Sequence, residues 1–240
     1  MDTDIYLVIF FVALLQSIFG VGVLLAGTPI LTLLGYSYFD VLSMTLPTSF
    51  FISLIQAFKL YNNININLLK KALLFTLPII PIGMVLASHL GNYIGILMGF
   101  FLILTSYDMI VDFILPSDAS NNRVSITLIF MGLIHGATNL GGGILPSVVN
   151  QKCEFKEQKL ATTAAIYLSF MLIQIILMGF RNYHADVSRS ILCVVVGLFA
   201  YILLGKYLFK LIRVEQYKNH LRIFIRIVAL LLVAVKLYDY

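Results

Sequence analysis

Apolar runs alternate with short polar segments along this chain, and the runs come in two sizes. Six of them approach the length of a membrane-spanning helix, which needs roughly 20 residues to cross the hydrocarbon core. These runs cover residues 41–60, 72–87, 93–109, 160–180, 191–209 and 221–237. The pattern therefore predicts six transmembrane helices, the second of them kinked where Pro78, Pro81 and Gly83 fall inside it.

Two shorter apolar runs, residues 5–18 and 125–138, each lead into a segment that interrupts helical structure. The second break is Gly136, Gly141, Gly142, Gly143 and Pro146, and its weaker copy in the first half is Gly20, Gly22, Gly27 and Pro29. Glycine loosens the backbone, and proline lacks an amide donor. Because lipid offers no hydrogen bonds, such breaks survive at membrane depth only where protein or a water-filled cavity covers them. In carriers they commonly mark the substrate site.

The two halves of the chain repeat the same order of segments. The separation from Pro29 to Asp40 equals that from Pro146 to Glu157, at 11 residues in each case. Further matched pairs are Thr45 with Thr162 and, within one residue, Gln56 with Gln174. We therefore expect two copies of a four-segment unit, residues 1–115 and 125–240, joined by a polar linker at 116–124.

Lysine and arginine indicate which segments cross the membrane, because they gather on the inner side. If both broken segments are re-entrant and the N-terminus lies outside, 13 of the 16 basic residues fall inside and 3 outside. If all eight segments cross, the better orientation gives only 9 against 7. Charge thus favours a re-entrant second break, but it does not decide the first, because no basic residue precedes it. Extending the repeat to the first break predicts an all-α polytopic membrane protein of two inverted repeats, each a re-entrant segment followed by three transmembrane helices.

Composition supports an integral membrane protein and excludes several other classes. Apolar residues make up 60% of the chain and charged residues 11%, with a mean hydropathy of +0.99. The net charge of +5 is explained by topology and anionic lipid headgroups, so we expect no nucleic-acid partner. The two cysteines are 40 residues apart, and we expect neither a metal site nor a cofactor. The glycine run lacks the lysine of a phosphate loop, and no enzyme motif is evident, which predicts a non-enzyme.

The breaks resemble a known family. The spacing Gly136-x4-Gly141-Gly142-Gly143-x2-Pro146, its copy Gly20-x-Gly22-x6-Pro29 and the threonine-bearing helix starts are similar to the sulfite exporter TauE/SafE family. The resemblance covers essentially the whole chain. It implies a multi-pass carrier of sulfur-containing anions such as sulfite, sulfoacetate or related organosulfur anions. The first half departs from the pattern, because its glycine cluster is reduced to Gly20-Val21-Gly22.

Binding a small anion in the membrane requires positive potential without an unpaired buried cation. Helix N-termini supply it through unsatisfied amides, and glycines let those amides approach the ligand. We predict that the breaks and nearby hydroxyl groups line the site, through Gly20, Gly22, Thr28, Pro29, Thr45, Thr48, Ser49, Gly136, Thr138, Asn139, Gly141, Gly142, Gly143, Pro146, Thr162 and Thr163. The alternative is close helix packing through small residues, with each hydroxyl bonded to its own helix.

His135 is the one histidine inside an expected membrane segment and the candidate for carrying a coupling proton, because imidazole titrates near neutral pH. The alternative, and the more frequent case for such a residue, is a neutral hydrogen-bonding member of the bundle. Gln56 and Gln174 either bridge helices or face the pathway. We predict a secondary transporter that exports a small sulfur-containing anion across the inner or plasma membrane by alternating access. A homo-oligomer is left open, and the alternative function is a non-transporting subunit or scaffold for a partner protein.

Overall fold

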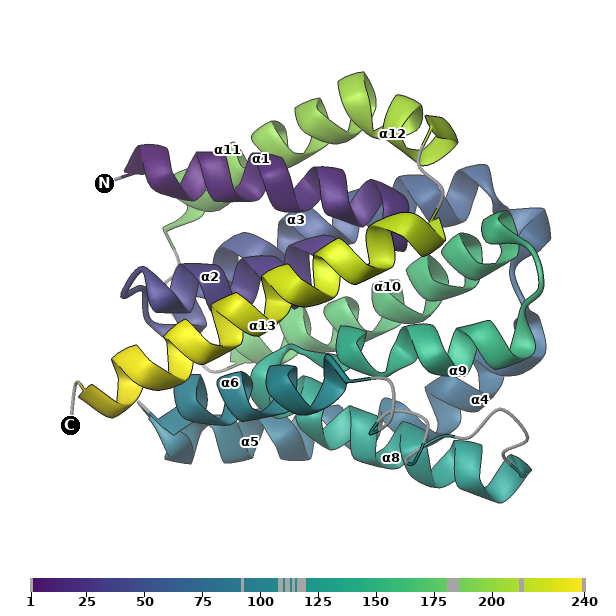
Figure 1. The fold of residues 1–240 in the computed structure, drawn as a ribbon, viewed down its shortest axis with the longest axis horizontal. Coiled ribbons are helices and arrows are strands. Elements are labelled where there is room, and N and C mark those ends of the chain that lie inside the picture. The colour runs from purple at the N-terminus through teal and green to yellow at the C-terminus, as the bar shows by residue number, and fades with distance from the viewer. Residues whose placement is uncertain are drawn as a thin grey trace.

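The computed structural model describes residues 2–91, 93–107, 110, 113, 115, 120–180, 186–211 and 214–238. Over these residues the protein is helical without a β-strand, which confirms the expected all-α class. The main helices run side by side along one axis, and α1 begins at the same end of the bundle at which α13 finishes (Figure 1). The central feature is a pair of broken helical hairpins enclosed by longer helices.

The first half consists of a broken helix, a long helix, a bent pair of helices and a shorter helix, with a 3₁₀ turn after the long one. Its elements are α1 (Asp2–Phe19), the π-helical turn η1 (Val23–Gly27), α2 (Thr28–Leu33), α3 (Tyr38–Lys59), the 3₁₀ turn η2 (Tyr61–Asn63), α4 (Ile66–Thr76), α5 (Ile80–Leu90) and α6 (Tyr93–Thr105). Two helix starts follow from polar caps: Ser37 accepts a hydrogen bond from Asp40 N, and Asn65 accepts one from Leu68 N.

The second half follows the same order. Its elements are α8 (Asn121–Thr138), the 3₁₀ turn η3 (Gly141–Gly143), α9 (Leu145–Lys152), α10 (Lys156–Phe180), α11 (Val187–Ala200), the π-helical turn η4 (Tyr201–Gly205), α12 (Lys206–Leu211) and α13 (Val214–Tyr238). Ser120 and Asp186 cap α8 and α11. The expected linker therefore ends inside α8, while residues 116–119 lie outside the described part. The boundaries of the two repeats remain a prediction.

Three helices of the described chain are long and apolar enough to cross a membrane: α3, α10 and the continuous stretch Val187–Gly205. The pair α4 and α5 makes a fourth candidate, bent by 47° where the chain passes through Pro78, which confirms the predicted kink. The described apolar parts of α6 and α13, Tyr93–Thr105 and Ile225–Val235, are shorter than a full span. The structure thus supports three or four of the six expected spans by length and composition.

Each broken segment folds back on itself. After α1, Gly20 adopts a φ of +76°, and Gly22 lies so close to α1 that an added Cβ would be 2.2 Å from Gln16 N. In the second half, Asn139 ends α8 in the left-handed conformation, with a φ of +65°. In Figure 1, α2 returns to the end of the bundle where α1 begins, and α9 returns to the opposite end, where α8 begins.

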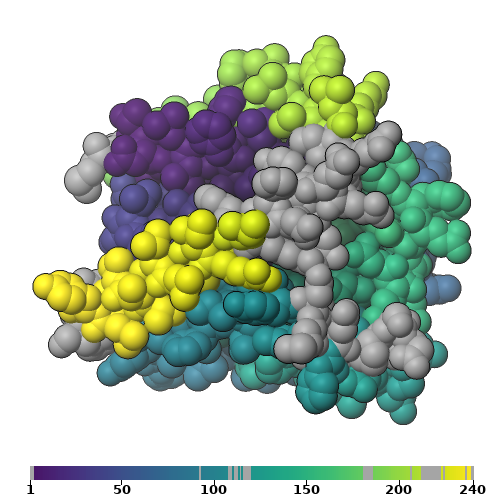
Figure 2. All heavy atoms as spheres, viewed as in Figure 1, coloured from purple at the N-terminus to yellow at the C-terminus, as the bar shows by residue number. Residues whose placement is uncertain are grey.

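The two halves are interleaved rather than packed as separate blocks. Each first helix lies on elements of the other half, α1 on α11 and α12 and α8 on α4 and α5, while α3 packs on α10. Likewise α13 lies along α6, where an added Cβ on Gly99 would meet Val233 Cγ2 at 2.4 Å (Figure 2). Hydrogen bonds also join the halves, as from Thr76 Oγ1 to Leu128 O at 3.0 Å. Each half therefore buries part of its helices against the other half.

Candidate functional site

The two breaks touch each other inside the bundle. Asn139 Nδ2 donates a hydrogen bond to Thr28 Oγ1 at 3.0 Å, across 111 residues of sequence, and both side chains are fully buried. Next to this bond, a Cβ added to Gly142 would lie 3.1 Å from Val21 Cβ and 3.4 Å from Leu25 Cβ. The glycine of one break thus packs directly on the first turn of the other. This contact point is the candidate site.

His135 caps the second break. Gly141 N donates to His135 Nδ1 at 3.2 Å, and the imidazole is fully buried. A ring nitrogen that accepts a hydrogen bond carries no proton, so the proton of the neutral ring lies on Nε2. Within the described residues Nε2 has no hydrogen-bond partner. The ring centroid lies 5.4 Å from that of Tyr167 and 5.2 Å from that of Phe170, so His135 is held by aromatic contacts and presents a donor edge.

One face of α10 runs past both breaks. Thr163, Tyr167, Phe170 and Gln174 follow the spacing of a single helix face. Thr163 Cγ2 lies 3.1 Å from where Gly20 would carry a Cβ, Tyr167 Oη lies 2.8 Å from that of Gly142, and Gln174 lies within interaction range of the His135 ring. This face therefore connects the first break to the second.

Several polar atoms around this point are buried without a hydrogen-bond partner among the described residues. They are His135 Nε2, Tyr167 Oη, both side-chain polar atoms of Gln174, and Asn139 Oδ1. Leaving such a group unpaired costs about 1–3 kcal/mol, so each calls for a partner such as water, an ion or a ligand. Their concentration at the contact of the two breaks is the main chemical feature of the molecule.

The first break is held by a different side chain in the same way. Gln16 Oε1 accepts from Val23 N at 3.1 Å and from Ser49 Oγ at 3.0 Å, and Gln16 Nε2 donates to Ser53 Oγ at 3.0 Å. Gln56 Nε2 donates to Gln16 O at 3.0 Å. In each half, a side chain near the end of the first helix therefore accepts a hydrogen bond from a backbone N–H just after that helix: Gln16 from Val23, and His135 from Gly141. The matched glutamines, Gln56 and Gln174, each approach that capping residue.

The predicted residues divide into those at the contact and those bonded elsewhere. Gly20, Thr28, Asn139, Gly141, Gly142 and Thr163 lie at or beside the contact of the breaks. Ser49 joins the Gln16 network, Gly22 packs on α1, and Pro29 and Pro146 occupy the first turns of α2 and α9. Three threonines bond to carbonyls of their own helices: Thr45 to Val41, Thr48 to Met44 and Thr138 to Ile134. Those three hydroxyls match the alternative given in the sequence analysis, in which each hydroxyl bonds to its own helix.

Three other predicted residues make packing contacts in this conformation. A Cβ on Gly136 would meet Ile80 O at 2.2 Å, and one on Gly143 would meet Thr105 Oγ1 at 2.7 Å. Thr162 Oγ1 accepts from Asn65 N at 2.9 Å and lies 3.7 Å from Cys153 Sγ, near the start of α10. There, burial raises the pKa of the Cys153 thiol, so it stays protonated near neutral pH. These residues connect helices in this structure.

Sequence reasoning missed Gln16 and Tyr167. Gln16 is a lone carboxamide side chain in an apolar run. It lies seven residues before Val23, whose backbone N–H donates a hydrogen bond to it. Tyr167 lies four residues after Thr163 on the predicted spanning run 160–180. Helical spacing from Thr163 and Gln174 would have placed Tyr167 on the same face.

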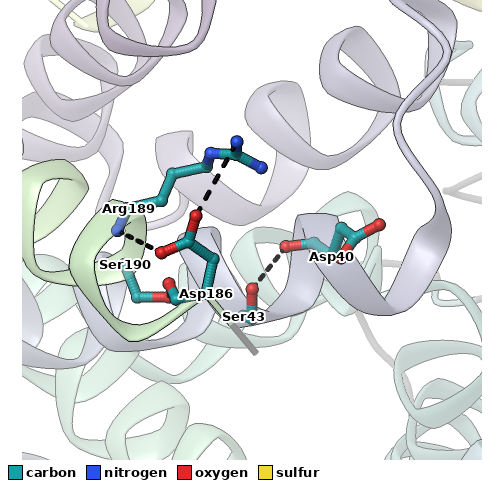
Figure 3. Close-up of polar contacts among 5 residues, drawn as sticks. All are labelled: Asp40, Ser43, Asp186, Arg189 and Ser190. Atoms are coloured by element: carbon teal, nitrogen blue, oxygen red, sulfur yellow. Dashed lines mark hydrogen bonds and ion pairs between the residues drawn. The ribbon is translucent and has the colours of Figure 1, made fainter. Parts of the chain in front are cut away.

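A groove of about 560 Å³ opens elsewhere, between α3, α10 and α11. Its lining is mostly apolar, as at Leu46, Phe51 and Met178, and none of the predicted binding residues belongs to it. The polar groups nearby are held locally: Ser43 Oγ donates to Asp40 O at 2.7 Å, and the Asp186 carboxylate accepts from Arg189 N at 3.0 Å (Figure 3). The groove suits hydrocarbon and not a small anion.

Long apolar helices around a buried polar centre, where two broken hairpins meet, define the protein as a membrane protein built like a transporter. Residues 5–237 match the family described as Sulfite exporter TauE/SafE. The chain belongs to this family, whose members are membrane transporters of sulfur-containing anions, as the resemblance in the glycine motifs indicated. It matches no curated protein and no solved structure.

Proposed function

We propose that the protein is a secondary transporter that exports a small sulfur-containing anion, such as sulfite or an organosulfonate, across the cell membrane. The observation that carries this proposal is the group of buried, unpartnered polar atoms at the contact of the two breaks. Membership of the TauE/SafE family supports sulfur-containing anions as the substrate class. The direction of transport rests on the same family.

The anion binds beside Gly142, where the contact of the two breaks buries several polar atoms without a hydrogen-bond partner among the described residues. Side-chain donors around this point are the Tyr167 hydroxyl beside Gly142 and the His135 ring beside Gly141, with the Gln174 amide next to His135. Two backbone amides at the breaks are engaged in this conformation, since Val23 N donates to Gln16 Oε1 and Gly141 N donates to His135 Nδ1. Binding through those two amides therefore requires the capping side chains to move.

Transport follows from two inverted repeats, residues 1–115 and 125–240, that rock against each other around this site. Two features support the opposed orientation. The hairpins α1–α2 and α8–α9 enter from opposite ends of the bundle (Figure 1), and each packs on the other half's helices. Opening one end then closes the other, because the first helix of each half is attached to the partner half.

A proton is the proposed coupling ion, and His135 its carrier. Nδ1 accepts the Gly141 amide, so a second proton on the ring must break that bond. Protonation would thereby release the turn that contacts Val21 and Leu25 of the first break. This links the charge of one side chain to the conformation of both hairpins.

Flux of labelled sulfite into or out of proteoliposomes tests the function. Purified protein should accelerate loss of sulfite from loaded vesicles well above protein-free vesicles of the same lipid. The rival function is a membrane scaffold or subunit without transport. Saturable binding of sulfite to the purified protein without any flux would support that scaffold and remove the carrier.

A further inference from the structure

An arginine lies inside an apolar helical segment. Arg226 falls within Ile225–Val235, the apolar part of α13, which runs antiparallel to α6. It is 12 residues before Tyr238, and its partner Ser106 is 13 residues after Tyr93, where the two exposed tyrosines mark one end of the helix pair. At 1.5 Å per residue both lie roughly 18–20 Å from that end, inside a hydrocarbon core of about 30 Å. Charged side chains at such depth are costly and are typical of ion and substrate pathways.

The Arg226 guanidinium is held at the end of α6. Its Nε donates to Ser106 Oγ at 3.1 Å, its Nη2 donates to Ser106 O at 2.8 Å, and its Cζ lies 4.2 Å from the centroid of the Tyr107 ring. These contacts keep the charge at the depth of α6 rather than at the headgroups, which arginine side chains otherwise reach. All three partner groups are neutral, and three of the five N–H groups make no hydrogen bond within the described residues. These N–H groups can bind an oxyanion.

The end of α6 also connects Arg226 to the second break. Thr105 precedes Ser106, and its Oγ1 lies 2.7 Å from where Gly143 would carry a Cβ. Arg226, Thr105 and Gly143 are half-buried, whereas the neighbouring Gly142 at the candidate site is buried. Irregular backbone is tolerated at membrane depth only against protein or water, so the exposed part of Gly143 faces water rather than lipid. Partly accessible polar groups thus lead from the arginine to the contact of the two breaks.

We propose that Arg226 receives the substrate anion on the inner side of the second break, from which it passes Thr105 and Gly143 to the candidate site. This proposal rests on the transport function proposed above and adds a residue to its pathway. The inner side follows from the distribution of basic residues along the chain. A guanidinium attracts an oxyanion by charge and binds it through planar N–H groups, and its neutral partners leave that charge uncompensated. The alternative role is a clamp, in which the cation only stabilises the last carbonyl groups of α6.

Exchanging the charge separates attraction of the anion from clamping of α6. Arg226→Gln removes the charge but keeps a donor for Ser106 O, whereas Arg226→Lys keeps the charge but loses the paired hydrogen bonds. We expect the KM for sulfite flux in proteoliposomes to rise roughly tenfold or more in Arg226→Gln, and to stay within about threefold of the wild type in Arg226→Lys. Arg189→Gln is the control, since Arg189 pairs with Asp186 at the start of α11, and it should keep the wild-type KM.

The outcomes distinguish a pathway residue from a clamp. An unchanged KM in Arg226→Gln would overturn the proposal. Equal rises in KM in both variants, with equal losses of melting temperature in detergent, would also overturn it, because they describe a clamp. Should Arg226→Gln fail to fold, Thr105→Val decides instead: it leaves the arginine and its bonds in place and should raise the KM roughly threefold or more, and an unchanged KM would remove the route along α6. Absence of sulfite flux in the wild-type protein would instead reject the transport proposal itself.

Discussion

At the residue scale, the glycines of the second break are not equivalent. Gly136 lies in the packing interface between α8 and α5, where an added Cβ would be 2.2 Å from a backbone oxygen. Gly142 instead faces a hydroxyl and two side chains of the opposite break. A methyl group at Gly136 therefore pushes two helices apart, whereas one at Gly142 changes the candidate site.

Gly142→Ala should reduce transport while leaving the fold intact. The added methyl would lie 2.8 Å from Tyr167 Oη and would displace the phenol or the first break. We expect sulfite flux to fall roughly tenfold, with a loss of stability of about 1–3 kcal/mol from overpacking. Flux assays and thermal unfolding in detergent measure the two effects. Gly179→Ala is the control, because no atom of the described residues lies within 4 Å of a Cβ added there, and it should keep normal flux. Normal flux in Gly142→Ala would exclude this glycine from the pathway.

His135→Ala should flatten the pH dependence of transport. The variant removes the acceptor of the Gly141 amide, so ring protonation can no longer control the second break. The measurement is sulfite flux across a series of pH values, compared at equal concentrations of hydrogensulfite. His89→Ala provides a matched histidine control, since His89 is exposed in the last turn of α5. If His135→Ala and the wild type share one pH profile, the histidine carries no coupling proton.

The sequence located both breaks but not the role of each residue in them. Glycine and proline mark a break because their backbone effects are local. Whether Gly136 meets a ligand or the carbonyl of Ile80 depends on which helix packs there, and that information is not local. The same reason explains why Tyr167 was missed: its importance comes from facing Gly142, 25 residues earlier in the chain.

At the element scale, the structure shows a hairpin at the first break, where the count of basic residues did not decide between a re-entrant and a spanning segment. No basic residue precedes this break, so topology rules do not apply to it. The structure forms a hairpin because Gly20 permits a left-handed turn and Gly22 permits close approach to α1. Gln16 then fixes the turn by accepting the Val23 amide. The kink between α4 and α5, in contrast, was predictable, since proline acts within its own helix.

Gln16→Leu should destabilise the first hairpin. The change strands the Val23 amide and the hydroxyls of Ser49 and Ser53 in a buried environment. Each stranded group costs about 1–3 kcal/mol, so we expect a clear fall in melting temperature in detergent. Thr45→Val is the control, because among the described residues the Thr45 hydroxyl bonds to Val41 O of its own helix, and its loss should have little effect. A melting temperature unchanged by Gln16→Leu would show that the hairpin does not depend on this network.

At the scale of the whole molecule, the sequence predicts two repeats but does not predict how the two halves interleave. Matched spacings such as Pro29 to Asp40 and Pro146 to Glu157 describe each half alone. They do not state that α1 packs on α11 or that α8 packs on α5. Because both hairpins are enclosed by the other half, the site at their contact belongs to neither half alone. Motion of one half relative to the other must therefore change the site.

Opposed hairpins predict that their connecting turns lie on opposite sides of the membrane. Leu34 follows α2 and Phe155 follows α9, and their exposed fractions of 50% and 69% make both suitable for labelling. In a background with Cys153→Ser and Cys193→Ala, both native cysteines being buried, a membrane-impermeant thiol reagent should label Leu34→Cys from outside the cell. Phe155→Cys should react only after the membrane is permeabilised, because the basic residues near it place that turn inside. Labelling of both positions from the same side would mean that the hairpins enter from one face, and rocking of inverted repeats would then no longer explain transport.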